Sequence, residues 1–182
     1  MKEIDHFSIH LLEQAKRFLE KAKAETDSEG KTAYLNASLL IGVSALEAHI
    51  NAIIDELLST WENLDILEIS LLSEKEINFS NGEFKLSEKL KMCRLIDRVE
   101  FIFKRFCKKR PLHKSESWWQ LLQEALRLRN KLVHPKEQVT LSELDVEQSL
   151  SGILDAINTL YKSLFNSPYP GYRRRLDSNL SF

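Results

Sequence analysis

The stretch from Lys31 to about Leu58 constrains the fold most, because it carries an unbroken helical repeat of apolar residues. Apolar side chains recur there every three or four positions, at Leu39, Val43, Leu46, Ile50, Ile53 and Leu57. A second line of mostly small residues runs beside this stripe, so the segment is apolar on most sides. Such a helix is normally enclosed by other helices. We therefore predict that this segment is the central helix of an all-α bundle.

Shorter stripes of the same period predict further long helices around this one. The chain of 182 residues has only five glycines and four prolines, which favours long helices over a strand-rich fold. Helices are predicted over 4–26 and 86–108, in a segment that ends at 134, and in a last segment that ends at 165. The segment 60–84 lacks a sustained period and is predicted to be an irregular or short-helix insertion. The expected fold is an antiparallel bundle of about five long helices.

Cap signals and breaks predict where the later elements begin and end. Ser115, with Ser117 as the alternative, is the predicted N-cap of the helix that ends at 134. The run Thr-Leu-Ser-Glu at 140–143 is predicted to form the capping box of the last helix. We expect one helical-bundle domain over residues 1–166 and a mobile C-terminal tail over 167–182.

The amino-acid composition limits the classes of function that the chain is expected to have. The net charge is −1, so any contact with nucleic acid must come from local basic patches. Cys93 and Cys107 lack the spacing of a metal or redox pair and are expected to be reduced thiols. No signal peptide and no uninterrupted apolar run of membrane-spanning length is evident. We therefore expect a cytoplasmic protein without membrane contact, bound metal or cofactor.

The most distinctive polar pattern is Arg-Asn-Lys-Leu-Val-His at 129–134, followed by Pro135. A residue before proline is pushed out of the right-handed helical region, which places His134 at the end of the helix. From there the imidazole can swing back toward the guanidinium of Arg129. Asn130 lies four residues before His134 on the same face and can orient the ring. The pattern predicts an Arg–His pair at a helix end.

This pair has two interpretations. Arginine grips phosphate oxygens with two parallel donors, and histidine exchanges a proton near neutral pH, so the pair suits chemistry at a phosphate. In the other interpretation Arg129, Lys131 and His134 are the solvated end of a helix, where the dipole favours cations. Residue types alone favour the second interpretation.

A polar line on the central helix offers a partner for the pair. Ser44, Glu47 and Asn51 recur at helical spacing next to the buried stripe. Buried carboxylates and amides need hydrogen-bond partners, because leaving them dry and unpaired is costly. One interpretation is a water-bridged or locally capped line. The other is that Glu47 or Asn51 pairs with the region around Arg129.

The run at 129–134 resembles the Arg-x4-His motif of the HEPN domains, and residues 44–51 resemble the second helix of several bacterial HEPN families. The resemblance covers about residues 31–165. It implies a small all-α bundle that acts as a metal-independent endoribonuclease of toxin or defence type. It assigns catalysis to Arg129 and His134, with Asn130, Lys131, Glu47 and Asn51 as the supporting residues.

The same resemblance implies RNA as substrate and a homodimer in which two motifs face each other. Attack by the substrate's own 2′-OH on the adjacent phosphate would need no metal. Two alternatives stay open. The first is a non-catalytic HEPN-like module that binds nucleotide, RNA or a protein partner such as a nucleotidyltransferase, whereas an antitoxin is the partner expected of a toxin. The second is a purely structural bundle in which the motif is only a helix end.

Overall fold

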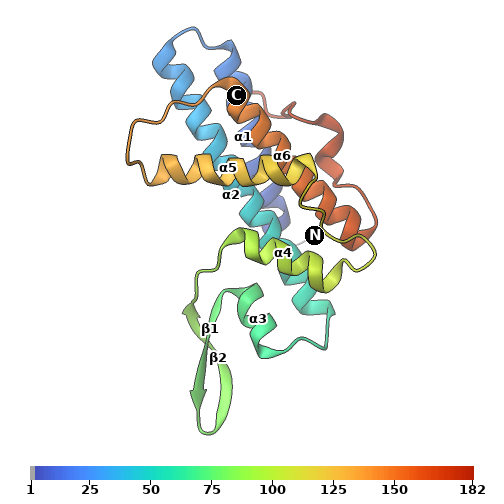
Figure 1. The fold of residues 1–182 in the computed structure, drawn as a ribbon. Coiled ribbons are helices and arrows are strands. Elements are labelled where there is room, and N and C mark those ends of the chain that lie inside the picture. Colours follow the sequence, from blue (N-terminus) through green and yellow to red (C-terminus); the bar gives the residue numbers. More distant parts are fainter. Residues whose placement is uncertain (1–2) are drawn as a thin grey trace.

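The computed structural model describes residues 3–182, with side chains from residue 6 onward, and is mostly helical (Figure 1). Its elements in chain order are α1 (Glu3–Ala24), α2 (Ser28–Thr60), α3 (Ile66–Ser73), β1 (Lys75–Ser80), β2 (Glu83–Leu90), α4 (Leu95–Phe106), α5 (Ser117–Val133), α6 (Glu143–Phe165) and the 3-10 helix η1 (Pro170–Arg174). The predicted dominance of helix is confirmed. The β1–β2 pair was not predicted.

α1, α2 and α6 form the body of the molecule, and α5 crosses the face of α2 and α6 (Figure 1). The central place predicted for α2 is confirmed, because its apolar stripe is buried against these neighbours. By length and composition alone α2 would pass as a membrane-crossing helix, and 56% of its most apolar window is buried within the fold. The core helix of a soluble protein passes the same test.

Gly152 of α6 sets how closely α5 approaches. A Cβ atom at this position would lie 2.6 Å from the Leu121 Cβ and 2.9 Å from both the Leu121 carbonyl carbon and the Leu122 nitrogen. Two of these three atoms belong to the α5 backbone, so rotation of a side chain cannot relieve the contact. The missing side chain therefore positions the helix that carries Arg129.

Gly152→Ala is expected to lower the free energy of unfolding by about 1–3 kcal/mol, because α5 must move away from α6. The higher helix propensity of alanine opposes this loss by about 1 kcal/mol. Gly30→Ala is the matched control, because a Cβ there meets only surface side chains of Glu25 and Asp27, each at 3.3 Å. Urea unfolding of both variants measures the difference. Equal stability of the two variants would contradict the close crossing.

The prediction of a helix over 86–108 is wrong in its first part. Residues 83–90 form β2, which pairs with β1 in a hairpin that projects from the body (Figure 1), and α4 begins only at Leu95. The turn residues explain this result, because Asn81 and Gly82 both have positive φ, at 54° and 82°. An Asn-Gly turn of this kind matches the twist of two antiparallel strands. Phe79 and Phe84 face each other beside it, with ring centroids 5.0 Å apart.

Two helix caps differ from those predicted. α5 begins after Glu116, so neither Ser115 nor Ser117 is its N-cap. The Glu116 carboxylate instead accepts the Trp118 indole N–H at 2.6 Å, where that ring enters the core. The capping box of α6 is formed by Ser142 and Asp145 rather than by residues 140–143.

The segment 167–182, predicted to be a mobile tail, packs on α1 and α6 in the structure. Tyr169 is buried, and Arg174 Nη2 donates to Glu13 Oε1 at 2.9 Å. The backbone N–H of Asn179 donates to Glu13 Oε2 at 2.7 Å. The polar composition of the segment suggested mobility. The buried carboxylate of Glu13 needs donors, however, and this segment supplies them.

Candidate functional site

Arg129 lies on α5 and reaches across to α2. Its Nη2 donates to Glu47 Oε1 at 2.7 Å, and the two side chains are 27% and 43% exposed. Of the two partners considered from the sequence, Glu47 is therefore the one that contacts Arg129. The Nε and Nη1 atoms of Arg129 donate to no described residue. The pair thus fixes the guanidinium and leaves donors free to receive an anion.

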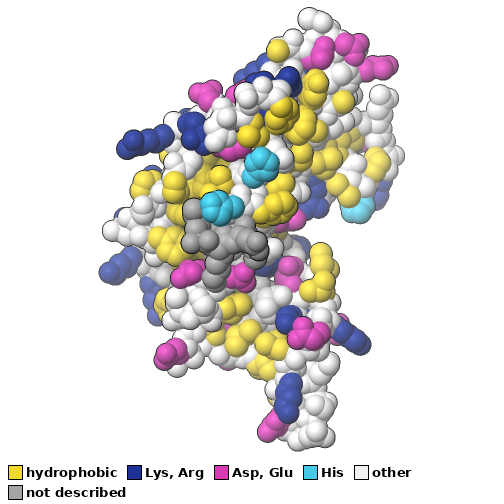
Figure 2. Space-filling view, turned by 180° about the vertical axis from the view of Figure 1, so that it is seen from behind, with side chains coloured by type: hydrophobic (Ala, Val, Ile, Leu, Met, Phe, Trp, Pro, Cys, Tyr) yellow, Lys and Arg dark blue, Asp and Glu magenta, His cyan; other side chains and the backbone are white. Residues whose placement is uncertain are grey.

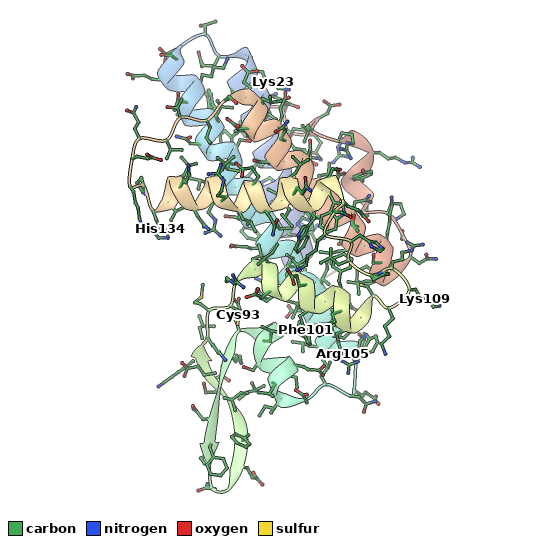
Figure 3. All side chains as sticks on the ribbon, in the orientation of Figure 1. Lys23, Cys93, Phe101, Arg105, Lys109 and His134 are labelled. Carbon is green, nitrogen blue, oxygen red and sulfur yellow. The ribbon has the colours of Figure 1, made fainter. Side chains whose placement is uncertain are left out.

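His134 follows the last residue of α5. Its backbone N–H donates to the Asn130 carbonyl at 2.9 Å, and its φ of −125° and ψ of 63° lie outside the helical region, as the following proline predicted. The side chain is exposed. In Figure 3 His134 lies at the free end of α5, on the same side of the molecule as Cys93, which precedes α4. The helix end is therefore open to a large ligand.

The structure does not bring the imidazole and the guanidinium together. Within the described residues, no hydrogen bond joins the His134 ring to Arg129 or to the Asn130 side chain. Arg129 lines a cavity of about 580 Å³, and His134 lines a neighbouring cavity of about 330 Å³. Arg127 and Asn130 line both cavities. Because the backbone leaves the helical conformation at His134, the ring is carried away from the face of α5 that bears Arg129.

The larger cavity lies between α2, α4 and α5, and we call it the arginine cavity. Four arginines line it, namely Arg94, Arg98, Arg127 and Arg129, together with the carboxylates of Glu47 and Glu74. Seen from behind, the surface is notched at one edge, between the bundle and the lower part that carries the hairpin (Figure 2). An arginine-rich cavity is suited to a phosphate, because each guanidinium offers donors in a fixed fork.

Arg98 joins α4 to α2 and α3, a role that was not predicted from the sequence. Its Nη1 donates to Glu74 Oε2 at 3.0 Å. Its Nη2 donates to Asn51 Oδ1 at 2.7 Å and to the Leu72 carbonyl at 2.9 Å. Burial lowers the pKa of this guanidinium, and the nearby Glu74 carboxylate opposes that shift. The signal in the sequence is that Arg98 falls in line with Leu95 and Ile102 on the apolar face of α4, where a charge needs partners.

The remaining supporting residues have separate surroundings. The Asn51 side chain accepts a hydrogen bond from Arg98 rather than from Arg129. Lys131 Nζ lies 4.0 Å from Glu137 Oε1, in the loop after α5. Both lie beside the cavities, but neither contacts Arg129 or His134 within the described residues. The sequence therefore predicted the right neighbourhood with a different set of contacts.

Arg105 in the last turn of α4 and Arg110 just after this helix both bind neighbouring elements. Arg105 Nε donates to Glu68 Oε1 at 2.6 Å, and Arg110 Nη1 donates to the Lys162 carbonyl at 2.7 Å. Figure 3 places Arg105 and Lys109 toward the other end of α4 from Cys93. These arginines therefore hold α4 to its neighbours, at a distance from the arginine cavity.

Both tryptophans in the first turn of α5 are buried. Trp118 is 6% exposed and Trp119 is 2% exposed, so both belong to the core. In the described part of the chain, no group of three or more His, Cys, Asp or Glu side chains is arranged to hold a metal ion.

Comparison of the chain with protein-family models, with curated proteins and with solved structures found no match.

Proposed function

We propose that the protein is a HEPN-type endoribonuclease that cleaves RNA without a metal, with Arg129 and His134 as its catalytic residues. The observation that supports this most is the Arg129–Glu47 pair across α5 and α2, beside the arginine cavity and one cavity away from His134. A guanidinium fixed on one side and an exposed imidazole at a helix end suit a phosphodiester lying across Asn130. The bundle of α1, α2, α5 and α6 is compatible with the small all-α domain that the resemblance implies.

In the proposed reaction the 2′-OH of one nucleotide attacks the adjacent phosphorus. The P–O5′ bond breaks, which leaves a 2′,3′-cyclic phosphate on one product and a 5′-hydroxyl on the other. His134 transfers a proton to or from the reacting oxygens. Arg129 stabilises the charge that develops on the phosphoryl oxygens. Asn130 lines both cavities and is placed to contact the substrate between them.

A two-fold dimer would complete this site. One imidazole cannot act as acid and base at once, and a symmetric partner facing the end of α5 would supply the second. Since both tryptophans are buried, the interface must use the exposed part of α5, such as Val133, which is 47% exposed. Light scattering tests this requirement. A monomer at the concentrations at which cleavage occurs would exclude a composite site.

The function is tested with purified protein and mixed cellular RNA, with and without EDTA. We expect cleavage in both conditions, and product ends that accept a 5′-phosphate from a kinase and carry a 2′,3′-cyclic phosphate. Cleavage that stops in EDTA, or products with 5′-phosphate ends, would contradict the proposed chemistry.

Glu47→Gln is expected to slow cleavage about tenfold while changing stability by less than about 1 kcal/mol. The amide still accepts a hydrogen bond but holds the guanidinium less firmly, and a partly exposed ion pair contributes little to stability. The matched control is Glu20→Gln on α1, because Glu20 pairs with Arg17 at a similar exposure and neither residue lines either cavity. Initial rates and urea unfolding of both variants separate the two effects. A rate for Glu47→Gln equal to that of the control would mean that the pair does not position Arg129.

A binding module without cleavage is the second candidate function. It is favoured by the separation of Arg129 and His134 into two cavities, because anion binding needs only the arginines. In that case the folded protein binds RNA or nucleotide, and the RNA in the cleavage assay remains intact. A protein partner of such a module could be a nucleotidyltransferase.

A further inference from the structure

The arginine cavity contains cationic groups that the proposed cleavage step does not use. Arg98 is the most buried of them, with a side chain that is 5% exposed. Its Nη atoms are engaged by Glu74, Asn51 and Leu72, whereas its Nε is buried and has no hydrogen-bond partner among the described residues. A buried N–H donor without an acceptor is costly, so an additional acceptor oxygen near Nε would be favourable.

The N-terminus of α4 opens onto the same cavity. Its N-cap is Arg94, whose side chain makes no capping hydrogen bond, and the next residues, Leu95 and Ile96, line the cavity. The first backbone N–H groups of a helix have no partner within the helix and carry the positive end of its dipole. A side chain such as Asp or Ser usually occupies this place. In α4 no side-chain cap is formed at Arg94, and the N–H of Asp97 donates to the Arg94 carbonyl, so the N–H groups of Leu95 and Ile96 are the ones available to an anion.

Two of the four arginines that line the cavity have carboxylate partners outside its lining. Arg94 pairs with Asp97 at 2.8 and 2.7 Å, and Arg127 pairs with Glu124, but neither carboxylate lines the cavity. The lining therefore has four guanidinium groups and two carboxylates. Arg94 is 79% exposed and keeps one Nη free of any described partner, so it can turn a donor toward a ligand. This arrangement favours an anion with several oxygens, such as a phosphate.

We propose that the arginine cavity is a phosphate-binding subsite for single-stranded RNA, and that it holds a backbone phosphate next to the one cleaved at Arg129 and His134. This inference rests on the proposed function. The subsite uses Arg94, Arg98 and the N-terminus of α4, which the cleavage step does not. The shared lining residues Arg127 and Asn130 connect it to the cavity of His134, so a strand that occupies one extends into the other. The apolar side chains of Met92 and Leu126 offer a surface for a ribose or base.

The test measures binding of a fluorescent single-stranded RNA with 2′-O-methyl ribose throughout, which cannot be cleaved by 2′-OH attack. The result therefore does not depend on whether the protein is a nuclease. Arg94→Gln is expected to weaken binding about five- to tenfold, the effect of losing one charge-assisted phosphate contact. It should also reduce the slope of log affinity against log salt by about 0.7. Arg173→Gln is the matched control, an exposed arginine in η1 with no described partner, and is expected to bind like the wild type.

A second variant changes affinity in the opposite direction. Asp97→Asn removes the carboxylate that competes for Arg94, so we expect it to bind the RNA more tightly than the wild type does. Circular dichroism checks that α4 is retained in every variant. Equal affinity of Arg94→Gln, Asp97→Asn and the wild type would overturn the subsite, even if the protein cleaves RNA.

A competition experiment distinguishes RNA from a free phosphate compound as the ligand of the arginine cavity. Inorganic pyrophosphate and AMP are added to the protein–RNA complex, and we expect displacement only at millimolar concentrations. Displacement at micromolar concentrations, lost in Arg94→Gln, would overturn the assignment to RNA and make the cavity a nucleotide site.

Discussion

His134→Ala is expected to lower the rate of RNA cleavage by about a hundredfold or more, because a positioned imidazole that transfers a proton contributes this much. Arg129→Ala is expected to lower it about a hundred- to a thousandfold, since it removes a donor that stabilises charge in the transition state. Neither change should unfold the protein. His134 lies after the end of α5, and the Arg129–Glu47 pair is partly exposed, so each contributes less than about 1 kcal/mol to stability.

The measurement is the initial rate on a short RNA at saturating concentration, in EDTA, with folding checked by circular dichroism. His113→Ala is the matched control for His134, because His113 is an exposed histidine in the loop between α4 and α5. Arg173→Ala serves the same purpose for Arg129. If both catalytic variants cleaved as fast as these controls, the activity would come from another site or from a contaminant.

The helical part of the fold could be predicted because periodicity over a long segment has few alternatives. The stripe on α2 fits only a helix that is enclosed on most sides, and the structure buries it in the centre. The hairpin was missed because Leu86 and Leu90, four residues apart, fit the helical period as well as the strand period. In such a short segment the decisive signal is the Asn81-Gly82 pair, whose positive φ angles suit a two-residue turn.

The candidate site could be predicted only at the level of which helices meet. A carboxylate and an amide on α2 needed hydrogen-bond partners, and in the structure Glu47 pairs with Arg129. Two further features decide which of Glu47 and Asn51 contacts Arg129. Arg98 donates a hydrogen bond to Asn51, and Gly152 permits the close crossing of α5. The separation of His134 from Arg129 depends on the backbone after the helix end, and residue spacing within a helix carries no information about it.

Glu13→Gln is expected to have the largest effect on stability, about 3–5 kcal/mol, because it leaves a buried charge without its partner. Glu13 is 2% exposed and Lys16 is 0% exposed, and Lys16 Nζ donates to Glu13 Oε1 at 3.0 Å. Arg174 and the backbone N–H of Asn179 donate to the same carboxylate. Trypsin should also cut the variant faster at the arginines of 173–175, because the C-terminal segment loses its main anchor on α1.

Glu20→Gln is the matched control for this substitution. It lies on the same helix and accepts the Ser178 backbone N–H at 2.7 Å, but its side chain is 31% exposed. We expect it to cost less than about 1 kcal/mol in urea unfolding, as partly exposed pairs do. Equal losses for the two variants would mean that the buried Glu13–Lys16 pair has no special role.

The pH dependence of stability provides an independent test of the same carboxylate. Burial raises the pKa of Glu13, but hydrogen bonds from Asn179, Lys16 and Arg174 outweigh burial and hold the pKa below its ordinary value of 4.5. A carboxyl group with a lower pKa in the folded state contributes stability above the unfolded pKa, and this contribution disappears as the pH falls through the folded pKa. The wild type should therefore lose more stability than Glu13→Gln between about pH 6 and pH 3. Urea unfolding at several pH values measures both slopes, and parallel slopes would show that Glu13 is not the group that titrates.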